Sequence, residues 1–356
     1  MERTVDPCYR PTLATDQIRN NLSALVSRGT IRNTTLSTAI KLLDERFRIY
    51  CTHYPYGLWA PGLVINGEMQ GLTEQYLPMA EIRPAFRQFF SLALRYPLSA
   101  ESDPVRTASC WLDLLQRLHL PGYAVNPAAL LRKLTEDEPS RIRFIFTALL
   151  PQHHGGSFSR YPAQGNFLKQ WLSRRSTFQP QGLRCLDAAC GTGEGSYDLA
   201  GILLQHGIPS ESVQVHGSSL EPLEVFAAAH NHFPQDPERE KQYRAITKPL
   251  FTSHATDRML FFRDNIMRQP EQEELPYDII LCNGLLGGPF LHGNEMLTNA
   301  MAALTKRLKK GGLLLAADRF HGGWKKDSPP SLMKEIMERN GLMVRQLHEG
   351  LVAEKI

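Results

Sequence analysis

The spacing of apolar residues divides the chain into two halves of different character. From about residue 12 to residue 150, apolar positions recur at helical spacing, in two stripes over 12–50 and in several more between the prolines of 72–150. The intervening residues 54–71 are rich in Gly, Pro and aromatic residues and predict a loop or a short hairpin. We therefore expect an all-helical N-terminal domain over residues 1–150.

The second half alternates between short apolar runs and helical stripes. The runs predict strands at 183–189, 213–218, 259–263, 277–282, 313–317, 343–347 and 351–353. Helical stripes lie at 225–229, at 296–308 closed by Gly311–Gly312, and at 332–337 closed by Asn340–Gly341. This alternation is typical of an α/β fold with a Rossmann-like, mostly parallel sheet and helices on both faces. We place that domain at 183–356, after a linker at 151–182 that carries a short amphipathic helix.

The chain between Leu183 and Leu204 passes from strand to helix through a turn that contains Gly191, Gly193 and Gly195. Glycines are needed in such a turn because a side chain would hold a ligand away from the backbone N–H donors and the positive helix N-terminus. In open parallel sheets, ligands bind at the carboxyl ends of the strands, where this turn lies. Dinucleotide-dependent dehydrogenases and methyltransferases that use S-adenosylmethionine (SAM) share this kind of turn.

The residue types in the turn favour SAM over a dinucleotide. Ser196 stands where the dinucleotide fingerprint has Gly or Ala. Glu194 places an anion where a diphosphate would have to approach, which is unfavourable. The same anion attracts the ammonium and sulfonium groups of SAM. The turn therefore predicts SAM as the cofactor.

Polar residues follow each of the next three predicted strands. Glu221, after the second, suits both ribose hydroxyls. Asp264 and Asn265 follow the third and suit the adenine amino group, and Asn283, after the fourth, opens a loop that should face the methyl group. Each of these residues is also common in turns or at helix starts, so none of them alone indicates a binding site. Their recurrence at one edge of the sheet is what predicts a cofactor site there. The candidate cofactor-binding residues are Asp187, Ala189, Gly191, Gly193, Glu194, Glu221, Asp264, Asn265 and Asn283.

Composition narrows the class of protein. The 356 residues are 42% hydrophobic and 21% charged, as in a globular protein, and a net charge of +4 without a basic run is too small to indicate nucleic acid. Six cysteines without CxxC pairs indicate a reducing compartment. A polar N-terminus and the absence of a long apolar run predict a cytoplasmic protein without membrane insertion. His153–His154 has no third ligand at a recognisable spacing, so we expect no metal.

Three segments resemble the chemotaxis-receptor glutamate methyltransferases (CheR type). Residues 188–200 read AACGTGEGSYDLA and are similar to that family's AACSTGEEPYSLA, with Glu194 on the acidic residue that holds the methionine amino group. Residues 277–286, YDIILCNGLL, are similar to FDLIFCRNVL. Residues 156–162, GSFSRYP, resemble TxFFRxP and place Arg160 beside the methyl donor.

The resemblance implies a class I SAM-dependent methyltransferase that methylates a protein glutamate, with an acidic helical segment of a receptor as partner. Arg160 and Asn283 are then the catalytic candidates. A glutamate acceptor is already ionised at neutral pH, so the reaction needs no strong general base. Arg160 would orient the acceptor or the donor carboxylate through its planar fork.

Several positions depart from the family pattern. The family has NET before FFR, where this chain has His154, Gly155 and Gly156, and its CRN is Cys282, Asn283 and Gly284 here. The span from Glu221 to Phe261 is also short for the inserted three-stranded subdomain with which the family docks on the receptor. Two alternatives therefore stay open beside the protein-glutamate reaction. One is a SAM-dependent methyltransferase that acts on a small molecule, and the other is a SAM-binding regulatory module without catalysis.

Overall fold

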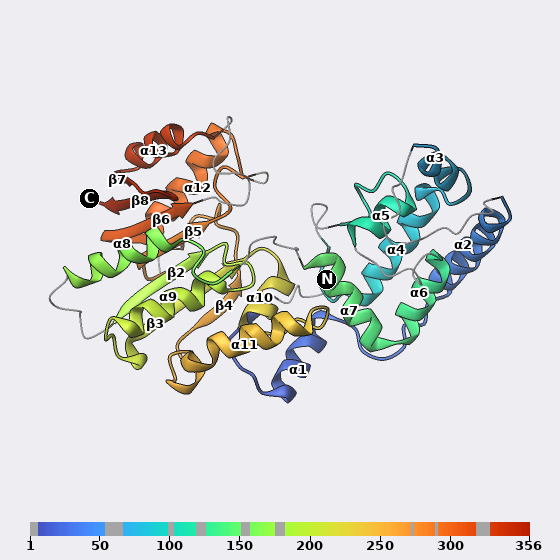
Figure 1. Cartoon of the computed structure of the whole chain (residues 1–356), viewed down its shortest axis with the longest axis horizontal. Coiled ribbons are helices and arrows are strands. Elements are labelled where there is room, and N and C mark those ends of the chain that lie inside the picture. The colour runs from blue at the N-terminus through green and yellow to red at the C-terminus, as the bar shows by residue number, and fades with distance from the viewer. Residues whose placement is uncertain are drawn as a thin grey trace. The chain divides into compact units, whose positions relative to one another are not determined.

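The computed structural model describes residues 6–53, 67–98, 103–118, 126–150, 157–174, 182–271, 274–288, 291–317 and 328–356. The chain divides into two compact units, one over residues 19–152 and the other over 6–18 and 153–356 (Figure 1). Residues 6–18 thus leave the helical domain in which the sequence places them. The reason is a short strand, β1 (Cys8–Tyr9), which pairs antiparallel with β4 (Leu260–Arg263) of the second unit.

The first unit is helical in its described part, as the apolar stripes predict. Aromatic residues of its fourth helix form the centre, where Phe86, Phe89 and Phe90 pack around Phe144. The predicted loop at 54–71 is wrong at its end, because residues from Gly67 onward are helical; residues 54–66 lie outside the described part. The helices are α1 (Thr15–Leu25), which begins in the second unit, α2 (Thr34–His53), α3 (Gly67–Tyr76), α4 (Met79–Ala93), α5 (Trp111–Arg117), α6 (Pro127–Glu136) and α7 (Glu138–Leu149).

The second unit carries the predicted alternation of strands and helices. Its strands after β1 and β4 are β2 (Leu183–Ala188), β3 (Val213–Ser219), β5 (Tyr277–Asn283), β6 (Leu308–Ala317), β7 (Leu342–Gln346) and β8 (Gly350–Lys355). Its helices are α8 (Pro162–Ser173), α9 (Glu194–Gln205), α10 (Pro222–His230), α11 (Pro237–Thr252), α12 (Asn294–Arg307) and α13 (Pro330–Arg339), with a 3-10 turn at Ser210–Ser212.

The described strands form one sheet in the order β1-β4-β3-β2-β5-β6-β8-β7. Strands β4, β3, β2, β5 and β6 run parallel, and β8 runs antiparallel to β6 and to β7. The chain proceeds outward from β2 through β3 to β4, then returns to β5 on the other side of β2. This reversal beside the carboxyl end of β2 is the switch point at which α/β sheets bind ligands. The Rossmann-like, mostly parallel sheet predicted from the sequence is confirmed.

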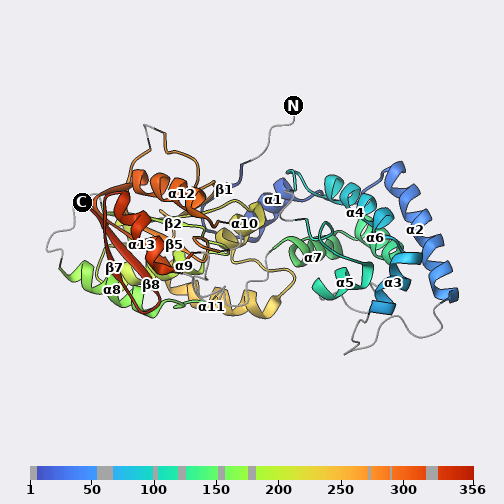
Figure 2. The ribbon, with the colours of Figure 1, turned by 90° about the horizontal axis from the view of Figure 1, so that it is seen from above.

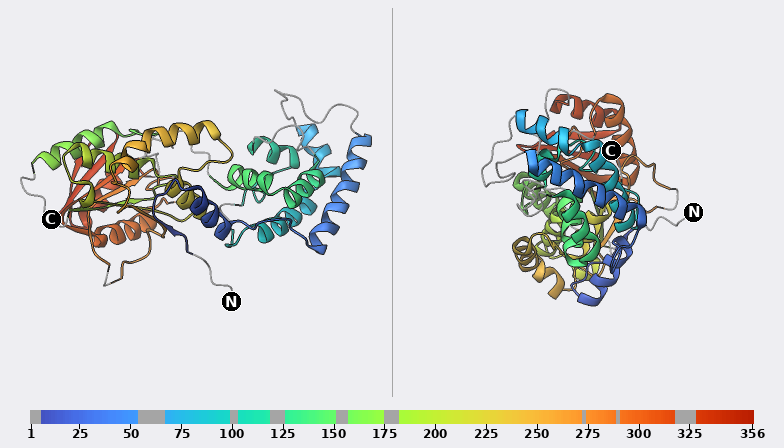
Figure 3. Two further views of the ribbon diagram at one scale, coloured as in Figure 1. Left: turned by 90° about the horizontal axis from the view of Figure 1, so that it is seen from below. Right: turned by 90° about the vertical axis from the view of Figure 1, so that its right-hand side faces the viewer.

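Helices cover both faces of this sheet, as Figures 2 and 3 show. On one face, apolar residues of α12 and α13 pack on the even-numbered positions Leu186 and Ala188 of β2 and on Ile280 of β5. The alternate positions of β2 point toward α9, whose Ser196 contacts Asp187. Because strand side chains alternate between faces, this register directs Asp187 to the α9 side.

The connection between β3 and β4 is helical. Its residues 220–259 are all described, form α10 and α11 and contain no strand, so they hold no three-stranded subdomain of the kind that the CheR-type resemblance implies.

Gly311–Gly312 does not close a helix as predicted. The pair lies inside β6, where the pairing with β5 shifts in register between Tyr277 and Ile279. Gly311 has a positive φ of 71°, which a glycine at a β-bulge adopts readily.

Candidate functional site

The glycine turn follows β2 and leads directly into α9. Ala189, Gly191 and Gly193 have positive φ values of 83°, 54° and 94°. A Cβ on Gly193 would lie 2.9 Å from Cβ of Ala228, so only glycine fits there. The N–H groups of Ala189 and Cys190 both donate to the carbonyl of Ser218 at 2.9 Å, which fixes the turn to the end of β3. The turn therefore presents the α9 N-terminus at the carboxyl edge of the sheet.

Asp187 lies beneath this turn and is buried, with an exposed fraction of 4%. Its carboxylate accepts a hydrogen bond of 2.8 Å from Oγ of Ser196. A Cβ on Gly195 would lie 2.8 Å from Oδ2 of Asp187, so the third glycine permits this close approach. Burial, together with the neighbouring carboxylates Glu194 and Asp198, raises the pKa of Asp187 to about 7, against the lowering effect of the Ser196 hydrogen bonds.

Glu194, in the first turn of α9, already has partners within the protein. Oγ1 of Thr192 donates to its two carboxylate oxygens at 2.9 and 2.8 Å. Nη2 of Arg239 donates to Oε1 at 3.0 Å and to Oγ1 of Thr192 at 2.7 Å. The sequence does not indicate that Arg239 pairs with Glu194. An arginine in a helix that follows β3 gives no local signal that its side chain reaches back to the glycine turn.

The linker before β2 is anchored beside the same turn. The backbone N–H of Ser159 donates to the carboxylate of Asp198. The ring of Phe158 lies edge-on to Tyr243 of α11 at 4.8 Å, and the Tyr243 hydroxyl donates to the Thr192 carbonyl at 2.5 Å. Burial raises the pKa of Asp198 to about 6, against the lowering effect of the Ser159 N–H. Residues 157–161 therefore pack against α9 and α11, next to the predicted methyl-donor site.

The two catalytic candidates lie on different elements, Arg160 in this linker and Asn283 at the end of β5. The Arg160 guanidinium carbon lies 5.5 Å from the ring centroid of Tyr161, immediately before α8. Asn283 ends β5, and its amide exchanges two hydrogen bonds of 3.0 Å with the amide of Gln164 in α8. Gln164 is buried, and it is not predictable from the sequence because it lies on a helix without a motif. The pair joins the linker helix to the end of β5.

Glu221 lies where the sequence places it, between the carboxyl end of β3 and α10. It is the N-terminal flanking residue of α10 and is half-buried. Its backbone N–H donates to Oγ of Ser219 at 3.1 Å, and that hydroxyl donates to the buried Glu224 at 2.5 Å. Because β3 neighbours β2, Glu221 lies one strand away from the glycine turn, as is expected of a residue that binds the ribose.

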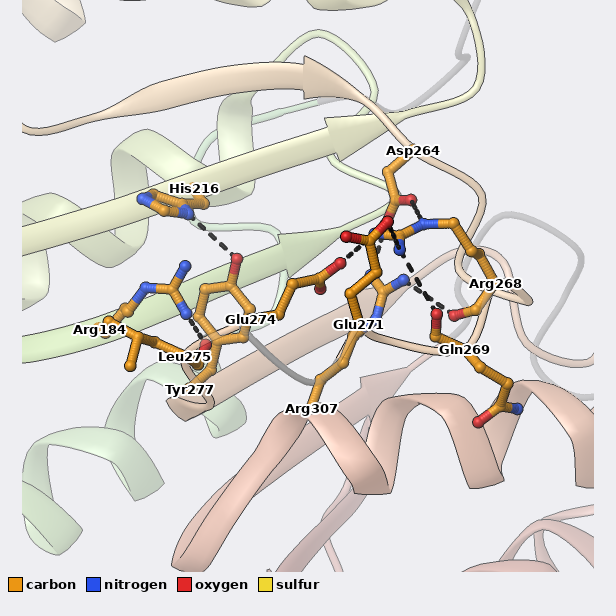
Figure 4. Close-up of polar contacts among 10 residues, drawn as sticks. All are labelled: Arg184, His216, Asp264, Arg268, Gln269, Glu271, Glu274, Leu275, Tyr277 and Arg307. Carbon is orange, nitrogen blue, oxygen red and sulfur yellow. Dashed lines mark hydrogen bonds and ion pairs between the residues drawn. The ribbon is translucent and has the colours of Figure 1, made fainter.

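Asp264, which the sequence predicts to contact the adenine, is paired with two arginines of the protein. Its carboxylate is buried between two guanidiniums, accepting from Arg268 Nε at 3.1 Å and from Arg307 at the end of α12 (Figure 4). Glu274 also accepts from Arg268, at 2.6 Å. The Asp264 carboxylate therefore balances a buried positive charge, and the adenine contact predicted for it stays a prediction. Asn265 is exposed, and its Oδ1 accepts from the Met267 N–H at 2.9 Å.

Other candidate features contribute nothing further to the site. Among the described residues, no group of three or more His, Cys, Asp or Glu is arranged to hold a metal ion, and His153–His154 lies outside the described part. None of the described helices has the length and apolar character that crossing a membrane requires. A cavity of about 230 Å³ between α8 and the β6–β8 strands is lined by Phe167, Trp171 and Arg345, apart from the glycine turn.

No protein-family model matches the chain, and no curated protein matches it. Solved structures match part of it: TrmN from Thermus thermophilus (17% identity, TM-score 0.31), the sugar N-methyltransferase KedS8 from Streptoalloteichus sp. ATCC 53650 (15%, 0.34) and SAM-bound CalS10, an amino pentose methyltransferase from Micromonospora echinaspora (14%, 0.33). These matches cover 53%, 57% and 54% of this chain and 48%, 90% and 90% of those proteins, so about half the length of TrmN is spanned. Identities and scores this low assign no activity, and the fold class rests on the strand order.

Proposed function

We propose that this protein is a SAM-dependent methyltransferase. The observation that carries the proposal is the placement of acidic side chains around one glycine turn at the switch point of a Rossmann-like sheet. Asp187 and Glu194 flank the turn itself, and Glu221 follows the neighbouring strand. A glycine turn supplies backbone donors at a helix N-terminus, and the carboxylates supply acceptors and negative charge.

The chemistry of these residues fits SAM. Burial and mutual repulsion raise the pKa of Asp187 and of Asp198, so a cation placed between the carboxylates would relieve an unfavourable interaction. Glu221 offers two carboxylate oxygens for the two ribose hydroxyls. Bound there, SAM would supply a methyl group made electrophilic by its sulfonium. The part of the protein is to bind and orient the donor and to exclude water from the reacting atoms.

For the acceptor we propose a carboxylate, as the CheR-type motifs imply. An ionised carboxylate needs no general base, and Arg160 has the planar donor fork that pairs with one. The Asn283–Gln164 pair fixes the end of β5 beside the same linker. The CheR-type family has its receptor-docking subdomain at the place where this chain has α10 and α11. A chemoreceptor as the partner is therefore supported by the sequence motifs alone.

Incubation with methyl-labelled SAM and candidate acceptors tests the proposal. Label on a protein that base releases as methanol supports carboxyl methylation, and stable label on a small molecule supports the small-molecule alternative. Binding without transfer supports the regulatory module. If calorimetry detects no binding of S-adenosylhomocysteine, the proposed function is wrong. A Glu211→Ala variant, changed at the opposite end of β3 from Glu221, is the matched control and should bind as the wild type does.

A further inference from the structure

Arg239 lies against the glycine turn with much of its hydrogen-bonding capacity unused. Nη2 donates to Oγ1 of Thr192 at 2.7 Å and to Oε1 of Glu194 at 3.0 Å. A guanidinium has five N–H donors, two of them on Nη2. The N–H groups on Nε and Nη1 have no hydrogen-bond partner among the described residues. Arg239 can therefore bind a further acceptor without leaving Glu194.

The position of Arg239 is fixed by contacts that leave those donors free. Its guanidinium carbon lies 4.4 Å from the ring centroid of Phe233, and stacking of this kind occupies the face of the fork while its N–H edge stays available. Arg239 stands in the first turn of α11, where Asp236 accepts from its backbone N–H at 3.0 Å. A cation at a helix N-terminus opposes the helix dipole, so helix stability does not explain an arginine here.

Resting on the proposed function, we propose that Arg239 binds the carboxylate of the methionine moiety of SAM while Glu194 binds its ammonium. A carboxylate has about four acceptor sites, so Glu194 keeps capacity beyond Thr192 and Arg239. An amino acid is a zwitterion, and a Glu–Arg pair presents one charge of each sign to it. Two fixed partners also specify the orientation of the methionine group, which a single carboxylate does not.

Three ligands separate this role from others, with binding measured by calorimetry. S-adenosylhomocysteine has both charged groups, its decarboxylated analogue keeps only the amine, and methylthioadenosine has neither. We expect Arg239→Gln to weaken the binding of S-adenosylhomocysteine by about tenfold or more, because a hydrogen bond between charged groups is lost. Binding of the two carboxylate-free ligands should change by less than about twofold. Arg239→Lys, which keeps the charge, should restore part of the lost affinity.

Arg244→Gln is the matched control, since Arg244 is an arginine of the same helix that pairs with Glu240 at 2.8 Å and should leave all three affinities unchanged. The inference is overturned if Arg239→Gln binds S-adenosylhomocysteine more tightly, because Arg239 would then compete with the ammonium for Glu194. An equal loss of affinity for all three ligands also overturns it. If Arg239→Gln does not fold, Arg239→Lys takes its place. The proposal is then overturned if Arg239→Lys prefers S-adenosylhomocysteine over the decarboxylated analogue by the same factor as the wild type. Absence of wild-type binding to every ligand instead refutes the proposed function itself.

Discussion

The side-chain amides of Gln164 and Asn283 face each other, and each donates one hydrogen bond of 3.0 Å to the other. The bonds join the first turn of α8 to the last residue of β5, and the two bonded residues are 119 positions apart in the chain. An amide pair of this kind satisfies a donor and an acceptor on each side. It therefore fixes where the linker helix lies relative to the sheet edge.

Removal of either amide should destabilise the protein. Gln164→Leu leaves Asn283 with an unpaired donor and acceptor, and we expect the free energy of unfolding to fall by about 1–3 kcal/mol. Asn283→Ala should cost a similar amount, and the double variant less than the sum, with a coupling of about 0.5–3 kcal/mol. Denaturant titration measures all three. Gln170→Leu, on an exposed position of the same helix, is the control, and strict additivity would show that the pair does not act together.

The ribose assignment predicts a strong effect at Glu221. Glu221→Ala should weaken binding of S-adenosylhomocysteine by at least about tenfold, because two hydroxyl groups lose their charged acceptor. Thermal unfolding should change little, since the side chain is half-buried at a helix start. Calorimetry with Glu211→Ala as control makes the comparison, and an unchanged affinity would remove Glu221 from the site.

The acidic cluster predicts a pH dependence of binding. The pKa of Asp187 is raised to about 7 and that of Asp198 to about 6, so both carboxylates ionise between mildly acid and neutral pH. Their negative charge attracts the ammonium of S-adenosylhomocysteine, and its affinity should therefore rise from pH 5 to about 7.5. Methylthioadenosine, which lacks the methionine ammonium, should show no such rise, and a flat profile for both ligands would contradict the prediction.

The buried ion pair of Asp264 predicts a loss of stability without a loss of binding. Asp264→Asn leaves the guanidinium of Arg307 buried without a countercharge, and the free energy of unfolding should fall by about 3 kcal/mol. Asp257→Asn changes an exposed aspartate paired with His254 and should cost less than about 0.5 kcal/mol. Should Asp264→Asn instead bind the cofactor poorly at full stability, the adenine contact predicted for Asp264 would be supported.

Arg160 should affect turnover more than cofactor binding. Arg160→Ala is expected to lower kcat by about tenfold or more with little change in the affinity for S-adenosylhomocysteine, because an orienting group acts mainly on the aligned acceptor. Arg174→Ala, at the other end of α8, serves as control. A normal turnover number for Arg160→Ala would refute the role.

Local patterns predict the sheet well and the helical termini less well. A short apolar run predicts each strand after the linker. In central strands such as β2, burial on both faces leaves a composition that a loop does not have. Gly341, with φ of 78°, closes α13 as predicted, since a left-handed residue ends a helix wherever it occurs. Gly311–Gly312 carries the same signal inside β6, and only the register against β5 shows that a bulge uses it.

Site residues divide in the same way. The turn residues Gly191 and Gly193 and the strand-end position of Glu221 follow from local sequence, because the carboxyl edge of a parallel sheet collects them. Gln164 and Arg239 do not, since each reaches the site from a helix that approaches through tertiary packing. The ion pair of Asp264 is not predictable for the same reason, because its partner Arg307 is 43 residues further along the chain.

The sequence by itself determined the class of sheet, the glycine turn and the carboxylates that follow its strands, because these depend on periodicity and on contacts between near neighbours. The tertiary structure alone decided which of those side chains are already paired. Ion pairs and amide pairs depend on distance in space, and charge partners such as Glu194 and Arg239 leave no periodic trace in the chain. Packing of α11 against the turn thus converts an apparently isolated carboxylate into one half of a charged pair.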